Sequence, residues 1–374
     1  YTSQWSLDVQ RRLPFDTVLS VGYVGNKGTH IDQTVELNAP APSILANPNG
    51  RRPIPSFVDG FGGPVRALNR LRWLTSDGNS WYHALQINAQ KRFSKGLQLN
   101  VAYTYSKAEG EGYGRNEGGG ALPNSYQNPR NRAAEKTRYG FDFRQSAVTS
   151  FLYELPTLPA FKDNFGKHIF GGWQMNGILL LQSGPYLTPT FTGTDPSGTG
   201  VLVRGVTTTQ RPDRIGNGNL SNPTLDAYFD KNAFVRPANN IGRFGNAGVG
   251  ILRGPGTEVF SMTLGKQFSL TEQLKLRYEA AFSNLFNHLN PNIPGTLNIT
   301  SAAFGRITRV QSVDQAGPRA GRRPGSTGGP EGCQVQPYSL GQAEVEVAGD
   351  QRSAAARQMG AQDAGEQRDR CGIE

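Results

Sequence analysis

The sequence has few of the residues that build covalent cross-links and metal centres. Its 374 residues include two cysteines, Cys333 and Cys371, and neither belongs to a CxxC motif. The first three hundred residues have none, which is compatible with an oxidising compartment. Its four histidines lie far apart, without the spacing of metal ligands: His30, His83, His168 and His288. We therefore expect no metal site, and we expect exposed histidines at the two positions where strands meet long loops, His30 and His288.

Catalytic motifs are also absent. The sequence contains no GxSxG, HExxH or paired-carboxylate signature. The glycine-rich run EGEGYGRNEGGG lacks GxGxxG spacing and a βαβ context, so it predicts a loop rather than a phosphate site. The run Asp195, Pro196, Ser197, Gly198 lacks the alternating acids of a calcium loop and predicts a turn. We expect a protein that is not an enzyme and takes no cofactor, and the residues that bind a substrate remain unknown.

Long apolar runs are missing as well. No stretch of 18 apolar residues exists, so no transmembrane helix is encoded, although a barrel strand needs only about ten residues of alternating character. Hydrophobic residues make up 36% of the chain, while 47 glycines and 24 prolines suit many strands joined by polar loops. The net charge of +10 comes from scattered basic residues without a basic helix, which argues against nucleic-acid binding.

Residues 81–107 show most clearly what the chain does contain. They predict two strands joined by a turn at residues 94–96, in which apolar and polar side chains alternate with period two. One face carries leucines and other apolar residues and ends in Tyr103 and Tyr105. The other carries amides and hydroxyls with almost no carboxylates. A wall with lipid on one side and water on the other has this pattern.

The same alternation recurs along the chain. Further strands are expected at residues 2–13, 17–24, 144–155, 172–183, 258–268, 274–286 and 305–310. Short turns join the members of each pair, whereas long loops join the pairs, as in an up-and-down barrel of an outer membrane. The fold class we expect is all-β: an antiparallel transmembrane β-barrel of which roughly nine or ten strands are present, with long outer loops. On the lumen face, Lys275, Arg277 and Glu279 are candidates to line a substrate path, but such charges more often pair across the wall, and we expect that here.

The composition changes near residue 312. Residues 312–374 have no Phe, Trp or Lys and show no sustained period, so we expect residues 1–311 to form the barrel part and the remainder to be disordered. A strand that should return beside residues 305–310 is not encoded here. We expect this tail to be a non-native end, of the kind that a frameshift produces.

The ordered motifs of residues 2–310 resemble the carboxy-terminal half of a TonB-dependent outer-membrane receptor of the Oar-like kind. They include VGYVGNKGTH, YHALQINAQKRFSKGLQLNVAYTYSKA, GGWQMNGILLLQSGPYLTP, GRFGNAGVGILRGPG and EAAFSNLFNHLNPN. The resemblance implies a barrel of about 22 strands with an amino-terminal plug, in the bacterial outer membrane among its lipids. It implies import of a bulky nutrient such as an oligosaccharide. The TonB complex would act through an amino-terminal part that this sequence lacks.

Two other functions stay open. A structural or adhesive surface barrel would bind partners through its long loops without transport. A soluble β-rich carbohydrate-binding module would carry aromatic pockets on its loops, but the alternation of a lipid-facing wall argues against it.

Overall fold

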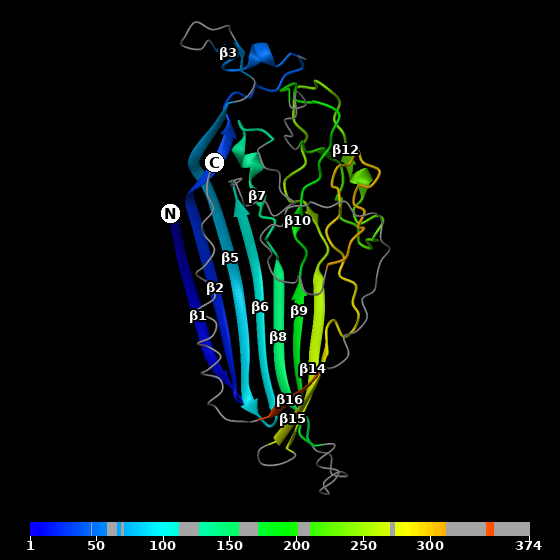
Figure 1. Ribbon diagram of the computed structural model, residues 1–374. Helices are drawn as coiled ribbons and strands as arrows, with labels where there is room; N and C mark the ends of the chain where they lie inside the picture. Colours follow the sequence, from blue (N-terminus) through cyan, green and yellow to red (C-terminus); the bar gives the residue numbers. More distant parts are fainter. Residues whose placement is uncertain are drawn as a thin grey trace, which may run out of the picture.

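A computed structural model describes residues 1–45, 47–57, 66–68, 71–111, 127–156, 171–200, 210–269, 274–311 and 342–347. One large antiparallel sheet of ten strands dominates it. Its long strands lie side by side (Figure 1). The strand order is β1-β2-β5-β6-β8-β9-β14-β15-β16, with the short β7 beside β6. Among the described residues, β1 and β16 each pair on one side only, so closure of the sheet is not seen.

The strands of this sheet have the following bounds: β1 Thr2–Leu13, β2 Thr17–Glu36, β5 Arg72–Ser94, β6 Leu97–Gly110, β7 Thr137–Arg138, β8 Gln145–Glu154, β9 Trp173–Gln182, β14 Thr257–Ser269, β15 Leu274–Phe282 and β16 Gln342–Val347. Every neighbouring pair is antiparallel. None of the helices in the described part of the chain is long and apolar enough to cross a membrane. The expected all-β fold with an antiparallel sheet of long strands is confirmed.

The connections sort by length between the two ends of the sheet. At the lower end in Figure 1, β5 and β6 are joined by Lys95 and Gly96 alone. Both residues have positive φ, 51° and 79°, which is the conformation of a primed two-residue hairpin turn. Phe15 and Asp16, between β1 and β2, also have positive φ. The long connections 37–71, 111–144, 183–256 and 283–311 leave from the opposite end, which we call the outer end.

The strand register aligns the apolar residues on one side of the sheet. A single row runs through Val9, Val21, Ile87, Tyr103, Ala147 and Leu181 and ends at Glu258 on β14. We call this side the aromatic face and the side of Gln86, Asn88 and Thr104 the amide face. Two aromatic rings lie over glycines of the neighbouring strand: a Cβ on Gly25 would stand 2.2 Å from the Trp5 ring, and one on Gly177 2.3 Å from Phe151. Such rings cover the gap that a strand glycine leaves.

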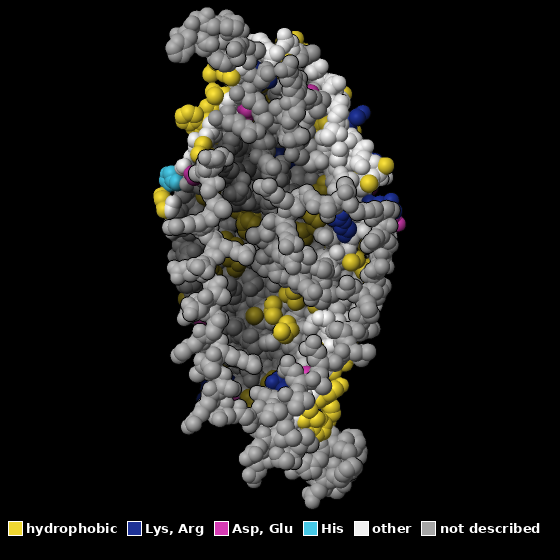
Figure 2. Space-filling view, viewed as in Figure 1, with side chains coloured by type: hydrophobic (Ala, Val, Ile, Leu, Met, Phe, Trp, Pro, Cys, Tyr) yellow, Lys and Arg dark blue, Asp and Glu magenta, His cyan; other side chains and the backbone are white. Residues whose placement is uncertain are grey.

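The outer loops build a small hydrophobic core of their own. It consists of the buried side chains Leu187, Phe191, Phe229, Ala233, Phe234, Leu252, Ile299 and Phe304. Short strands help to hold it: β10 (Tyr186–Leu187) pairs with β13 (Leu252–Arg253), and β11 (Asp213–Arg214) pairs with β12 (Phe234–Val235). On the first loop, β3 (Ser56–Phe57) pairs with β4 (Arg66–Ala67). Figure 2 shows yellow hydrophobic side chains at the surface from the outer end down to the turn end.

Strand limits agree closely with the sequence in most places. Two differences lie in the residues that follow the start of β15. Residues 305–310 form no strand. Ile307 donates to Leu225 O, and Val310 makes only an isolated bridge to Pro291, so this segment pairs with loops. Strand β15 ends at Phe282 rather than at residue 286, because Asn284 and Asn287 have positive φ.

Two strands are longer than the sequence predicted. β2 and β5 continue outward as one ladder from Gly25 opposite His83 to Glu36 opposite Arg72, with two register irregularities on the way. The sequence had predicted strands only at residues 17–24 and from residue 81 onward, with a long loop between them.

In the tail, the structure describes only Gln342–Val347, which forms β16 and pairs with β15. The sequence had predicted no strand there. The disorder expected for the rest of residues 312–374 concerns positions outside the described part.

Candidate functional site in the outer loops

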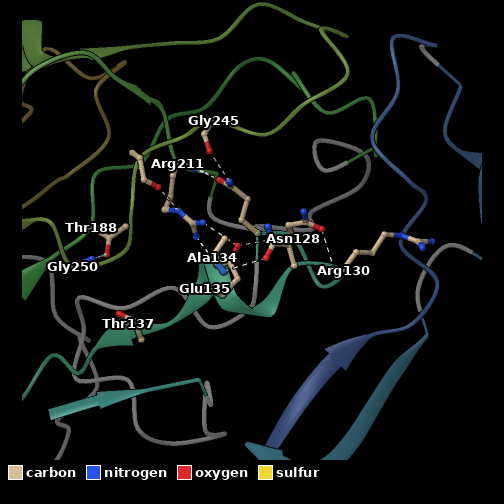
Figure 3. Close-up of polar contacts among 12 residues, drawn as sticks. Asn128, Arg130, Ala134, Glu135, Thr137, Thr188, Arg211, Gly245 and Gly250 are labelled. Carbon is tan, nitrogen blue, oxygen red and sulfur yellow. Dashed lines mark hydrogen bonds and ion pairs between the residues drawn. The ribbon is translucent and has the colours of Figure 1, made fainter. Parts of the chain in front are cut away.

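A buried ion pair joins two of the outer loops. Glu135 lies in the short 3₁₀ helix η2 (Arg132–Glu135) of the second loop, and Arg211 lies in the third, 76 positions further along the chain. The guanidinium donates to both carboxylate oxygens, at 2.6 and 2.9 Å (Figure 3). The two side chains are 0% and 3% exposed. A bidentate pair of this kind fixes orientation as well as distance.

Backbone groups complete the network around this pair. Arg211 also donates through Nε to Ala247 O at 2.8 Å, and Glu135 Oε1 accepts from the Asn128 amide at 3.1 Å. Gln127 accepts from the Arg211 amide and donates to Gly245 O (Figure 3). Both carboxylate oxygens of Glu135 and three N–H groups of the Arg211 guanidinium therefore have partners, which offsets part of the cost of burying the ion pair.

A pocket of about 300 Å³ opens beside this network, and we call it the loop pocket. Its wall includes Asn128, Asn131 and Asn246, together with Arg243 and Phe244. The side-chain oxygens of the three asparagines accept backbone amides, whereas their amide NH₂ groups donate to none of the described residues. The pocket thus offers several donors, a cation and one aromatic ring.

Arg243 is held in place by a second bidentate pair. It donates to both oxygens of Asp213 at 2.6 and 2.7 Å, and its side chain is 54% exposed. These hydrogen bonds lower the pKa of Asp213 below its ordinary value, against the opposing effect of partial burial. Arg243 is therefore a fixed cation at the rim of the loop pocket.

The first loop is attached to the same assembly. Arg51 donates to Gly198 O of the third loop and to Ala41 O and Leu45 O of its own loop. Arg130 of the second loop donates to Ala39 O at 3.0 Å. The first three outer loops therefore meet at one place, although they are far apart in the sequence.

A second pocket, of about 480 Å³, lies at the outer ends of β8, β9 and β14, and we call it the rim pocket. Strand residues on the aromatic face form one wall, with Tyr103, Ala147 and Leu181 beside Glu258. Loop residues Tyr228, Pro255 and His288 form the other. Burial raises the pKa of Tyr228, so its hydroxyl remains protonated at neutral pH.

The polar side chains of the rim pocket differ from those of the ion-pair network. Among the described residues, no side-chain partner exists for Gln145, Gln182, Glu258 or the His288 ring, nor for the Tyr228 hydroxyl. The amide and carbonyl of Glu258 bond to Asn290, which leaves its carboxylate free for another molecule.

The residues singled out from the sequence have scattered positions. His83 lies on β5 with Nδ1 2.7 Å from the Tyr23 hydroxyl, and His30 lies within β2 with φ 59°. His288 reaches the rim pocket, and His168 is outside the described residues. The described residues hold no cluster of His, Cys, Asp or Glu that could bind a metal ion. Most of the glycine-rich run near residue 115 also lies outside them.

Two smaller predictions can be compared with the structure. Asp195 caps its own turn: it accepts from Ser197 Oγ at 2.7 Å and from the Gly200 amide at 2.6 Å, which confirms the predicted turn. Arg277 Nε donates to Glu279 at 2.9 Å, so these two charges pair along β15. The register also sets Arg277 opposite Glu344 and Lys275 opposite Glu346, and the pairing of these charges across the wall stays a prediction. The Glu135–Arg211 pair was not predicted, because nothing in the local sequence marks two residues 76 positions apart as partners.

Comparison with known proteins decides the family. The model of the family described as "Outer membrane beta barrel domain" matches residues 1–322. The chain belongs to this family. It is therefore an outer-membrane β-barrel protein of bacteria, from a family that is typically non-enzymatic.

A solved structure also shows similarity. The chain matches the outer membrane transporter YddB from Escherichia coli with 8% sequence identity and a TM-score of 0.41, over 82% of this chain and 30% of that one. The chain thus spans less than a third of that transporter. No curated protein matches it.

Proposed function

We propose that this chain is the barrel portion of a TonB-dependent receptor that imports a bulky polar nutrient, an oligosaccharide being the class that fits best. The observation that carries the proposal is the joining of three outer loops at one end of the sheet, around a pocket of about 300 Å³. Arg243, the Phe244 ring and three asparagine NH₂ groups line this pocket, and these NH₂ groups donate to nothing in the described part of the chain. Such groups bind sugar hydroxyls and cover the apolar face of a sugar ring.

The two-sided sheet supports the same function. The amide face carries Gln86, Asn88 and Thr104 in neighbouring positions, a polar lining of the kind found inside outer-membrane barrels. The aromatic face would then contact lipid. Energy would come from a TonB complex in the inner membrane that acts through a plug.

Uptake by the full-length receptor in its native bacterium tests this proposal. Cells should accumulate a labelled oligosaccharide in the periplasm, and deletion of the receptor gene or of TonB should abolish accumulation. The double variant Asn128→Ala with Asn131→Ala should reduce uptake, because both donors are lost from the loop pocket. The variant Asn222→Ala is the control, since this exposed asparagine lies outside the pocket. Uptake that is independent of TonB would contradict the proposal.

The alternative is a surface barrel that binds a partner without transport. The extensive internal pairing of the loops favours it, because a rigid loop surface suits adhesion. Binding to whole cells that persists without TonB, together with no periplasmic accumulation, would establish this function instead.

A further inference from the structure

We propose that the rim pocket binds the uncharged sugar headgroup of an outer-leaflet lipid, whose acyl chains lie along the aromatic face. This inference goes beyond nutrient uptake, because it assigns a second ligand to a different pocket, at the outer ends of β8, β9 and β14.

The position of the pocket favours a lipid. Its strand wall belongs to the row of the aromatic face that continues through Ile87 and Val21 to Val9. These side chains are apolar and partly exposed, Val9 to 63% and Val21 to 37%. In an outer-membrane barrel, a face of this kind contacts acyl chains, and its outer end lies at the level of the headgroups. Toward the turn end, the same face of the pocket's own strands carries Leu179, Phe260 and the stacked ring of Phe151, so a molecule seated in the rim pocket has an apolar surface directly below it.

The chemistry of the pocket favours hydroxyl groups. Glu258 and the side-chain oxygens of Gln145 and Gln182 can accept hydrogen bonds, and the Tyr228 hydroxyl can donate one. A sugar presents several hydroxyls that donate and accept at the same time, so one headgroup can satisfy groups from three strands and a loop. The rings of Tyr103 and Tyr228 offer apolar surface for the ring carbons of the sugar.

The charge of the pocket disfavours a phosphate headgroup. No lysine or arginine is among its lining residues, and Glu258 contributes a carboxylate. Arg253 acts electrostatically on Tyr228 but does not itself line the pocket. Two anions placed together in a partly dry pocket repel each other. A neutral glycosyl headgroup avoids this repulsion, whereas phosphatidylglycerol does not.

Lipid binding to the purified full-length receptor tests the inference. Native mass spectrometry would compare three probes: a monoglucosyl diacylglycerol, a phosphatidylglycerol with the same acyl chains, and methyl glucoside. We expect retention of the glycolipid alone. The double variant Glu258→Leu with Gln145→Leu should bind it about tenfold more weakly, as two lost hydrogen bonds predict. Glu154→Leu, at the turn end of β8, is the control and should bind normally.

A second variant distinguishes a lost hydrogen bond from a misfolded protein. Tyr228→Phe removes only a hydroxyl and should still weaken glycolipid binding by a few fold. Heat-modifiable electrophoretic mobility would show that each variant is folded. Equal retention of phosphatidylglycerol, binding of methyl glucoside as tight as that of the glycolipid, or normal binding by both folded variants would each overturn the inference. None of these outcomes would alter the uptake experiment, which depends on the loop pocket.

Discussion

Replacement of Arg211 by alanine should open the outer loops while leaving the sheet intact. The change leaves the Glu135 carboxylate, 0% exposed, without its bidentate partner. Removal of one member of a buried pair costs about 3–5 kcal/mol, because an uncompensated charge stays in a dry site. At about 1.4 kcal/mol per factor of ten, the opening equilibrium should rise by roughly two to three and a half orders of magnitude.

Hydrogen exchange in the full-length protein measures this opening directly. The amides of Asn128 and of position 211 are suitable reporters, because they donate to Glu135 and Gln127 within the network. Their protection should fall by the factor given above, whereas amides in the middle of β8 and β9 should keep theirs.

A matched pair in the same assembly provides the control. Arg243 and Asp213 have the same bidentate geometry, but the Arg243 side chain is 54% exposed. Arg243→Ala should therefore cost at most about 1 kcal/mol. Joint replacement by apolar residues, Glu135→Leu with Arg211→Met, should recover much of the protection, because no buried charge is then left alone. Equal effects of the two arginine variants, or normal protection in Arg211→Ala, would refute the reasoning from burial.

Three further predictions concern other parts of the chain. Gly177→Leu should reduce the yield of heat-modifiable barrel in outer membranes, because a Cβ would meet the Phe151 ring at 2.3 Å; substitution of the unobstructed Gly50 should not. Asn38→Ala should speed proteolysis of the first loop, because Asn38 is fully buried and bridges three backbone groups. Loss of these hydrogen bonds should lower the stability of the loop by about 1–3 kcal/mol. Unchanged cleavage would argue against this role. Because the pKa of Asp213 is lowered in the folded loops, its ionised form stabilises them at every pH above the ordinary aspartate pKa of about 3.9. This stabilisation is lost as the pH falls through the lowered pKa. The protection difference between wild type and Arg243→Ala should accordingly shrink on acidification, and a difference that grew would contradict this.

The sheet could be predicted from the sequence because its information is local. In residues 97–105, apolar and polar side chains alternate with period two, so each residue type predicts the face of the sheet on which it lies. The observed register is consistent with Leu99, Val101 and Tyr103 on one face. The turn at Lys95 and Gly96 was also readable, since glycine is suited to positive φ. The wrong strand at residues 305–310 shows the limit of this signal. An apolar residue such as Ile307 can be buried by loops as well as by a sheet.

The candidate site could not be predicted, because its contacts join residues that are far apart in the sequence. Gln127 and Gly245 are 118 positions apart, and Arg51 and Gly198 are 147 apart. No periodicity connects such residues. Only the strand order places their loops together, and a single sequence leaves that order to be inferred from the strands themselves.

Because the strand order positions the loops, substrate specificity can be encoded separately from the folding of the loops. The strands bring the loop ends close, so the loops need not bear the full entropy of closing connections of many tens of residues. Buried partners such as Glu135 and Arg211 can then fix the assembled loops. The amide NH₂ groups of the loop pocket lie beside that network and donate no hydrogen bond to the residues that the structure describes, so they can change without loss of a buried charge. Substrate preference should therefore change through Asn128, Asn131 and Asn246 while the ion pair and the sheet remain as they are.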